Sequence, residues 1–418
     1  MEDGPQSKKM SEKKQKKKCL CLLTPFHGIF QYLSQKKYIL NEISKSFDDF
    51  YLINSERLEF FSKKKEINIE KVKENIPQNC IIFDPKNSKE FLQFAKNKEL
   101  IVYSNIGRFW REFRTHYLLK KTNSKIIYLQ NIGNFQTTFY PKTRSLILQY
   151  FFKHFPHKVV ILLSILKIFP KVDLRFLSIK KNYDRAINNF FYKLSKKIKF
   201  LNFFYTKEFI LINSLAHDVN KSNSLDISEE KIVMVDTNIN HKDNVLYSGR
   251  ISEEKVKKIY ETLASFLKKI SNIFGKPVTV CVHPSSNLEQ IKNYMKDFEV
   301  VKYKTKENIY KSFITFFYDS SSIVDAFLLR KKILVLENHL MGKSITGLSA
   351  IYPPKTGIIK INLNQEFIIN NKNEFLEKIK NTTKSKKYND FINNNLQPDG
   401  NTNGTKKFIQ KIKEKYFN

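Results

Sequence analysis

Two apolar runs that each end in small polar residues constrain the fold of this chain more than any other feature. The first, Val278-Thr-Val-Cys-Val-His-Pro-Ser-Ser286, indicates a buried strand that stops at His283-Pro284, because proline cannot continue a hydrogen-bonded ladder. The second, Phe313-Ile-Thr-Phe-Phe-Tyr-Asp-Ser-Ser-Ser322, ends where a helix is expected to begin. Such strand ends are typical of an open α/β sheet, in which ligands bind beyond the carboxyl ends of the strands.

The same alternation of short strands and amphipathic helices occurs in both halves of the chain. Strands are predicted at 19–24, 50–53, 80–83, 100–103 and 125–129, and again at 231–236, 278–282, 313–318, 332–336 and 358–361. Strands separated by helices predict parallel βαβ units. The predicted fold class is therefore α/β, with two Rossmann-like lobes.

The length of 418 residues agrees with two domains, because a single core rarely grows this large. We expect a basic tail without structure over 1–17 and a first lobe over 18–140. A basic, aromatic helical insertion over 141–227 is expected to complete the first lobe. The second lobe is predicted over 228–418, with helices at its end.

The net charge of +34 indicates an anionic partner, which can be a polyanion, an acidic membrane face or a charged substrate. A compositional bias toward Lys, Asn, Ile and Phe, as in proteins from AT-rich genomes, is the alternative cause. The chain has four cysteines, Cys19, Cys21, Cys80 and Cys281, and their spacing predicts buried thiols in a reducing cytoplasm, with no disulfide or metal site.

The segment 141–205 lacks clear strand patterns and interleaves aromatic with basic residues, as in Phe190-Phe-Tyr-Lys-Leu-Ser-Lys-Lys-Ile-Lys199. Amphipathic helices of this kind suit an anionic membrane surface. A helical insertion that packs on the first lobe, with lysine stems around it, is the alternative. The most apolar stretch, 146–169, contains lysines, histidines and a proline, so no membrane-spanning helix is expected.

The two strand ends also suggest chemistry. A histidine at the position of His283 can donate to a phosphate oxygen or protonate a departing phosphate, although it can also simply cap the strand. Asp319, Ser320, Ser321 and Ser322 open the next helix. One such residue is explained by N-capping, whereas hydroxyls together with free helix-start amides can bind phosphate without a metal. Glu337 ends another strand and is a candidate contact for base or ribose.

An HP step after one buried strand and a serine cluster after the next resemble the CMP-sugar site of bacterial sialyltransferases and polysialyltransferases. Two segments of the first lobe are similar to motifs of the same enzymes. These are the turn Leu22-Leu-Thr-Pro-Phe-His-Gly28 and the segment Lys125-Ile-Ile-Tyr-Leu-Gln-Asn-Ile-Gly-Asn-Phe-Gln136. The resemblance covers most of residues 19–345 outside the basic insertion.

The resemblance implies a metal-independent, inverting glycosyltransferase of the two-lobed GT-B architecture, which needs no cofactor. It implies that His283, Pro284 and Ser285 hold the donor phosphate together with the serine cluster, and that Thr24 and Gly28 approach the donor. The donor would be a CMP-linked sialic-acid-like or Kdo-like sugar and the acceptor a surface glycan or glycolipid of capsule or lipooligosaccharide synthesis. The enzyme would act in the cytoplasm, peripheral to the anionic inner membrane.

One position departs from that pattern. The related turn carries an acid that deprotonates the acceptor, whereas this chain has Gln130 and Asn131, followed by Gly133. Amides cannot act as general bases near neutral pH. His27 is the substitute candidate, and a surface histidine in a turn is the alternative interpretation of it. An inactive assembly subunit would also explain the missing acid.

Other functions fit parts of the pattern. A UDP-sugar transferase or a polyol-phosphate transferase of the teichoic type would use a similar HP step and serines. The charge alone favours a nucleic-acid-binding protein, but the sequence contains no RNA-recognition motif, zinc pattern or clear helix-turn-helix, and its basic residues are spread over both lobes. Nucleic acid is therefore not the expected partner.

Overall fold

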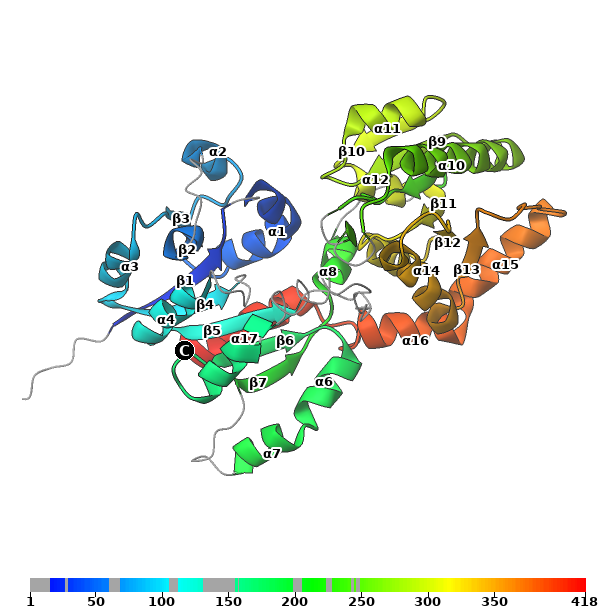
Figure 1. Ribbon diagram of the computed structural model, residues 1–418. Helices are drawn as coiled ribbons and strands as arrows, with labels where there is room; N and C mark the ends of the chain where they lie inside the picture. The colour runs from blue at the N-terminus through cyan, green and yellow to red at the C-terminus, as the bar shows by residue number, and fades with distance from the viewer. Residues whose placement is uncertain are drawn as a thin grey trace, which may run out of the picture. The chain divides into compact units, whose positions relative to one another are not determined.

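The computed structural model describes residues 16–26, 29–59, 68–104, 112–130, 155–156, 158–197, 205–222, 228–241, 244–245 and 249–418. Within them lie a seven-stranded sheet of order β3-β2-β1-β4-β5-β6-β7 and a six-stranded sheet of order β10-β9-β8-β11-β12-β13 (Figure 1). In each sheet the first strand of the chain lies inside the sheet, and the next two strands extend from it to one edge. The following strands then add on the other side of the first strand, which is the Rossmann order. The predicted α/β class with two Rossmann-like lobes is confirmed.

The strands of the first sheet are β1 (Lys17–Thr24), β2 (Phe50–Asn54), β3 (Cys80–Phe83), β4 (Lys98–Ser104), β5 (Lys125–Gln130), β6 (Val172–Leu177) and β7 (Thr206–Leu211). Those of the second are β8 (Lys231–Val235), β9 (Val278–Val282), β10 (Glu299–Lys302), β11 (Ser312–Phe317), β12 (Lys332–Glu337) and β13 (Ile359–Asn362).

The helices that accompany the first sheet are α1 (Ile29–Ser44), the short 3-10 helix η1 (Glu56–Leu58), α2 (Ile69–Lys73), α3 (Ser88–Ala95), α4 (Phe113–Lys121), α6 (Lys180–Ile187), α7 (Phe190–Lys197) and α8 (Leu215–Ser222). The later helices are α10 (Glu253–Phe274), α11 (Leu288–Tyr294), α12 (Thr305–Tyr310), α13 (Ile323–Leu328), α14 (Lys343–Thr356), α15 (Lys372–Lys384), α16 (Lys386–Asn395) and α17 (Gly404–Tyr416).

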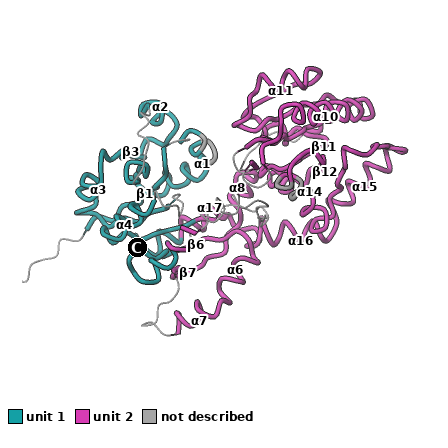
Figure 2. Tube along the Cα trace, in the orientation of Figure 1, with its two compact units in different colours: residues 1–128, 160–173, 411–418 teal, residues 129–159, 174–410 magenta. Residues whose placement is uncertain are grey.

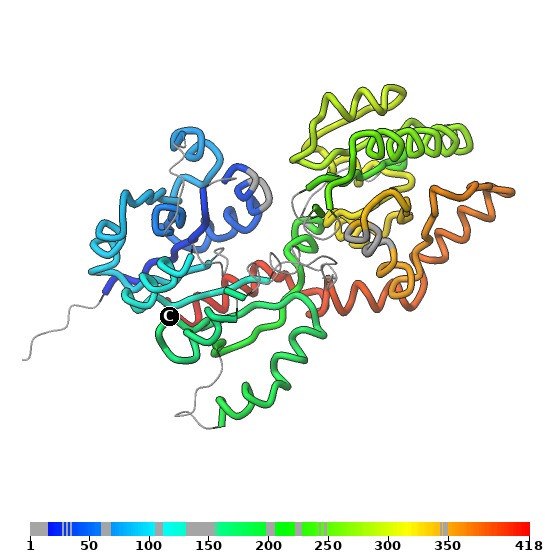
Figure 3. The backbone as a smooth tube through the Cα atoms, viewed as in Figure 1, coloured from blue at the N-terminus to red at the C-terminus, as the bar shows by residue number. Residues whose placement is uncertain are grey.

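The chain divides into two compact units. Unit 1 comprises residues 1–128, 160–173 and 411–418, and unit 2 comprises 129–159 and 174–410 (Figure 2). The backbone thus returns to unit 1 at its C-terminal end, drawn in red in Figure 3. There the ring of Phe417 packs edge-on against Phe47, with ring centroids 5.0 Å apart.

Several elements differ from the sequence-based expectation. The segment 141–227 was predicted to be helical, but it also supplies the strands β6 and β7 of the first sheet. Both are short, and β7 carries Lys207 and Glu208 among its apolar residues, which weakens the strand pattern. Strand β10 was also missed. The helices predicted at the end of the second lobe include α15 and α16, which are separate because Ser385 adopts an extended conformation and caps α16 by accepting a 3.2 Å hydrogen bond from the Tyr388 N–H.

The core of the second sheet lies on both of its faces. Alternate strand residues fall into two buried clusters, one with Met234, Val280 and Phe316 and the other with Val235, Cys281 and Phe317. The first cluster is covered by α10 and α11, and the second by α13 and α16. A strand buried on both faces shows no polar alternation, as in β9, where all five residues are buried.

Helix α10 shows how the sequence sets these elements. Its core residues, among them Ile259, Leu263, Phe266 and Ile270, recur at helical spacing, and this stripe packs on the sheet. The helix ends at Gly275, whose φ of 62° lies in the left-handed region that glycine adopts at little cost. Strand β9 begins three residues later and crosses the sheet, so His283 lies at the carboxyl edge, opposite the edge at which β9 begins.

Within the described part of the chain, no helix combines the length and apolar character needed to cross a bilayer. The four cysteines are buried free thiols.

Candidate functional site at the carboxyl edge of the second sheet

The chain reverses its direction across the second sheet between β8 and β11. These two strands pair in parallel, with Val235 opposite Phe317, and β8 connects through α10 to β9 while β11 continues toward β12. Parallel α/β sheets bind ligands at such a reversal, beyond the carboxyl ends of the strands. The residues after β8, β9 and β11 therefore form the candidate site.

His283 is held in one orientation at this edge. The backbone N–H of Ser285 donates to His283 Nδ1 over 3.1 Å, and Ser285 Oγ lies 2.8 Å from the same nitrogen. The amide of Asn238, in the loop after β8, donates to Ser285 Oγ over 2.8 Å. Because a backbone N–H can only donate, Nδ1 is an acceptor, and the proton of the neutral ring resides on Nε2.

Three influences lower the pKa of His283, of which partial burial is the largest, followed by His241 and Lys302. The rings of His241 and His283 meet edge to face, with centroids 5.6 Å apart. Lys302, the last residue of β10, donates to the Ser286 carbonyl over 3.0 Å. The imidazole is consequently neutral at physiological pH and presents an N–H donor close to an ammonium group.

The serine cluster lies after β11, and β8 separates it from His283 in the sheet. The Ser322 N–H donates to Ser320 Oγ over 3.3 Å, and the Ser320 carbonyl accepts the N–H of Ile323 over 3.2 Å. Ser321 is exposed. The cluster thus forms a tight turn into α13. A phosphate centred over the end of β8 would be about 5 Å sideways from β9 and from β11, the usual spacing of neighbouring strands.

Two carboxyl groups follow neighbouring strands at this edge. Burial raises the pKa of Asp319, after β11, to about 7. Burial likewise raises the pKa of Asp236, after β8, to about 7, although hydrogen bonds from Tyr260 and Thr237 lower it in part. Both groups are therefore partly protonated near neutrality, which limits their repulsion of an anion.

Asp236 lies on the α10 face of the sheet. Its Oδ2 accepts a 2.7 Å hydrogen bond from the Tyr260 hydroxyl, and the ring of Tyr260 stacks on Tyr294 of α11 with centroids 5.3 Å apart. The other carboxyl oxygen and the buried hydroxyl of Tyr318 have no hydrogen-bond partner within the described residues. From the sequence alone, a turn after the predicted strand accounts for Asp236, because its position beside β11 depends on the strand order.

A small cavity of about 210 Å³ opens beside Ser285. Its lining is mostly polar and combines amide, aromatic and charged side chains from the loop after β8, from α10 and from α11: Asn238, Asn240, Arg250, Glu253, Tyr260, Asn287, Gln290 and Tyr294. Amides and tyrosines of this kind can hydrogen-bond the hydroxyls or ring nitrogens of a ligand. Most of these residues were not predicted from the sequence. The polar residues that follow β8 were the sequence feature that could have indicated them.

The other residues predicted from the sequence that the structure describes each end a strand. Glu337 pairs with Lys360 of the adjacent strand, with Oε2 and Nζ 2.8 Å apart, so its carboxylate is already engaged. Thr24 ends β1 and is buried, and its carbonyl accepts the N–H of Ser55 over 3.0 Å. Gln130 ends β5, where its carbonyl accepts from Ser178 Oγ over 3.2 Å. His27, Gly28, Asn131 and Gly133 lie outside the described residues.

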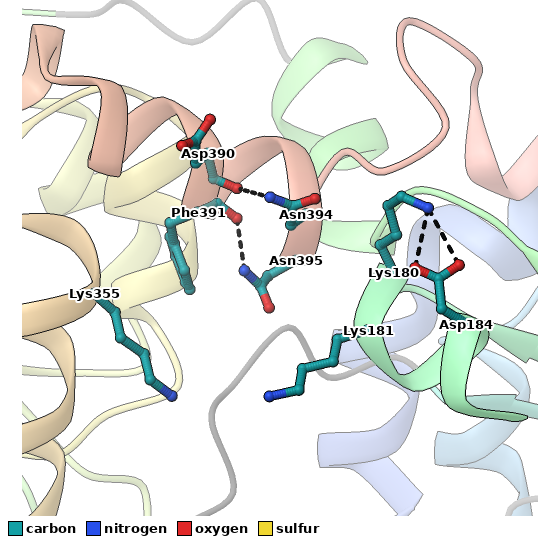
Figure 4. A pocket seen from close by; sticks show the side chains of 8 residues that line it. All are labelled: Lys180, Lys181, Asp184, Lys355, Asp390, Phe391, Asn394 and Asn395. Atoms are coloured by element: carbon teal, nitrogen blue, oxygen red, sulfur yellow. Dashed lines mark hydrogen bonds and ion pairs between the residues drawn. The ribbon is translucent and has the colours of Figure 1, made fainter.

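A second cavity, of about 450 Å³, lies in unit 2 beside the helices α6, α14 and α16. Figure 4 shows Lys181 and Lys355 extending into it from opposite sides. The side-chain amides of Asn394 and Asn395 bond carbonyls of their own helix, and Lys180 pairs with Asp184. Lys355 is at the end of α14 that leads into β13, so this cavity is not at the carboxyl edge.

No protein-family profile matches the sequence, and no curated protein matches it. Solved structures with similar chains include UDP-GlcNAc 2-epimerase from Methanocaldococcus jannaschii, with 12% identity and a TM-score of 0.49 over 95% of this chain and 99% of that one. A glycosyltransferase from Rickettsia africae has 11% identity and a TM-score of 0.47 over 95% and 99%. The wall teichoic acid polymerase TagF has 13% identity and a TM-score of 0.44 over 96% and 89%.

Within the described residues, no three His, Cys, Asp or Glu side chains come together in a way that could hold a metal ion.

Proposed function

We propose that the chain is a glycosyltransferase that binds the phosphate of a nucleotide-activated sugar at the carboxyl edge of the second sheet. The observation that carries this proposal is the orientation of His283, whose Nδ1 is occupied by donors from Ser285. The ring can therefore offer only Nε2–H to a ligand, and phosphate oxygens are good acceptors for such a donor. Lys302, whose charge acts on His283, adds an attractive potential.

This geometry suits stabilisation of a leaving nucleotide. When the acceptor hydroxyl attacks the anomeric carbon, the bond from that carbon to the phosphate oxygen breaks, the phosphate keeps the electron pair, and the proton of the hydroxyl passes to water. The developing charge on that oxygen is stabilised by fixed donors. Because the pKa of His283 is lowered, the role we assign to it is hydrogen-bond donation rather than proton transfer.

For the donor we propose a CMP-linked acidic sugar, because the HP step and the serine cluster resemble the CMP-sugar site of sialyltransferases. Single displacement at the anomeric carbon, and hence inversion, follows from the same resemblance. The acceptor class is a surface glycan or glycolipid. UDP-linked sugars and polyol phosphates activated by CDP are the alternative donors for the same edge.

The test measures nucleotide release by the full-length chain from CMP-, UDP- and CDP-linked donors, with and without acceptor glycans. We expect release from one donor class in the presence of acceptor, and at least a tenfold loss of that release in His283→Ala. His339→Ala is the matched control, since His339 is an exposed histidine after β12. If His283→Ala released nucleotide as fast as wild type does, His283 would not contact the donor phosphate. Release from UDP-linked donors alone would show that the donor is a UDP-sugar and not a CMP-sugar.

A further inference from the structure

Helix α7 (Phe190–Lys197) exposes an aromatic face that the donor site does not use. Phe190 is 69% exposed and Phe191 is 56% exposed. Their rings contact each other edge-on, with centroids 5.6 Å apart. Side chains of this size are seldom left side by side in water unless they meet a partner.

The next residue anchors the helix from its other side. Tyr192 is buried, and its ring packs edge-on against Phe209 of β7 with centroids 5.0 Å apart. Leu177 of β6 belongs to the same cluster, and residues of α6 pack against it. Tyr192 therefore fixes the rotation of α7 about its axis and keeps both phenylalanines away from the sheet.

Helical spacing gathers the apolar residues on one arc. At about 100° per residue, Phe190, Leu194 and Phe191 fall within roughly 100° of one another. Lys193 and Lys197 lie beside that arc, and both are exposed. The segment 180–197 carries six Lys or Arg residues and one carboxylate, that of Asp184, which Lys180 pairs with.

We propose that α7 is an interfacial anchor that inserts Phe190 and Phe191 into an anionic phospholipid surface. The lysines match the charge of acidic headgroups, and the phenylalanine pair enters the acyl boundary, which is how surface-lying amphipathic helices bind. A nucleic acid or an acidic glycan would satisfy the lysines but would leave the apolar arc in water. Membrane binding by α7 does not depend on the donor site or on the nucleotide that occupies it.

The test is co-sedimentation of the full-length chain with phosphatidylcholine vesicles that contain or lack 30 mol% phosphatidylglycerol. We expect wild-type protein to partition onto the anionic vesicles. The double change Phe190→Ser and Phe191→Ser should reduce the partition coefficient at least tenfold, because each aromatic side chain contributes a large apolar area. Lys193→Gln and Lys197→Gln should each reduce it about fivefold at low salt.

Ile368→Ser is the matched control, since Ile368 is 60% exposed in unit 2 and far along the chain from α7; it should bind vesicles as wild type does. Phe191→Trp preserves the apolar face and adds an indole to a chain that has a single tryptophan. Its emission should shift to the blue on anionic vesicles by more than that of wild type.

Two results would overturn the proposal. One is vesicle binding that the double serine variant retains in full, together with no additional shift in Phe191→Trp. The other is a wild-type dimer in light scattering that the double serine variant dissociates, without vesicle binding by either protein. The second result would make this face an interface between copies of the chain.

Discussion

The backbone N–H of Ser285 donates to Nδ1 of His283 across 3.1 Å, and this contact sets the chemistry of the carboxyl edge. A second donor, Ser285 Oγ, is held toward the same nitrogen by Asn238. Protonation of the ring requires Nδ1 to become a donor, which would break the contact with the Ser285 N–H and force the Ser285 hydroxyl to turn from donor to acceptor. Together with partial burial, this geometry favours a neutral histidine whose free donor is Nε2–H.

Removal of the Ser285 hydroxyl should raise the pKa of His283. Ser285→Ala deletes one donor to Nδ1 but keeps the backbone N–H, so we expect a rise of up to about one pH unit, the equivalent of one neutral hydrogen bond of about 0.5–1.5 kcal/mol. A pH titration of the His283 ring by NMR measures this change, with His283→Ala identifying the resonance. A fall in the pKa would show that Nδ1 carries the proton in the neutral ring.

Replacement of His283 should weaken nucleotide binding in proportion to the lost donor. We expect His283→Ala to reduce affinity for the donor nucleotide about 10- to 100-fold, because a hydrogen bond to a charged group contributes about 1.5–3 kcal/mol. His283→Gln keeps a side-chain N–H and should lose less. Calorimetric titration checks both, and equal losses in the two variants would argue against a donor role.

Nucleotide affinity should also fall as the pH rises through about 7. Burial raises the pKa of Asp319 to about 7, so below that pH the carboxyl is neutral and can donate to phosphate, whereas above it the carboxylate repels phosphate. Asp319→Asn should flatten this dependence between pH 6 and 8. The phosphate's own titration is common to both proteins and cancels in the comparison. If nucleotide affinity depended on pH in the same way in wild type and Asp319→Asn, Asp319 would not be the cause of the dependence.

Asp236 should make the folded state less stable at high pH. Its pKa in the folded chain, about 7, lies above the usual aspartate value of 3.8, so its contribution to stability is complete below pH 3.8 and is lost as the pH rises to about 7. Relative to Asp236→Asn, the free energy of unfolding of wild type should fall by up to about 1.4 kcal/mol per pH unit in that interval. Urea unfolding at pH 5 and 8 measures the difference. A difference that does not change with pH would show that the carboxyl is ionised in both states.

The start of α17 should tolerate no side chain at Gly404. A Cβ there would lie 2.5 Å from the Asn213 carbonyl oxygen, while the Gly404 N–H donates to the buried carboxylate of Asp218 over 3.0 Å. Gly404→Ala should therefore cost about 1–3 kcal/mol of unfolding free energy. Lys406→Ala, an exposed change in the same turn, is the control. If Gly404→Ala left the free energy of unfolding unchanged, the start of α17 and the backbone at Asn213 could move apart at little cost.

The local elements and the ends of the strands could be predicted from the sequence. Runs of buried residues, as in β9 and β11, and the stripe of α10 carry their own periodicity, so the α/β class and the positions of His283 and Asp319 could be predicted. Strands β6 and β7 could not, because short strands with charged residues lack a distinctive pattern, and they form by pairing with neighbours distant in the chain.

Which strand ends lie side by side depends on the order of the strands in the folded sheet. In the sequence, His283 and the serine cluster follow strands that were predicted one after the other. In the sheet, β8 lies between those strands, and this order brings Asp236, Asn238 and His241 into the site. Strand order depends on the packing of helices on both faces of the sheet, which is a property of the whole core. Side-chain roles such as the neutral state of His283 then follow from contacts that no local pattern encodes.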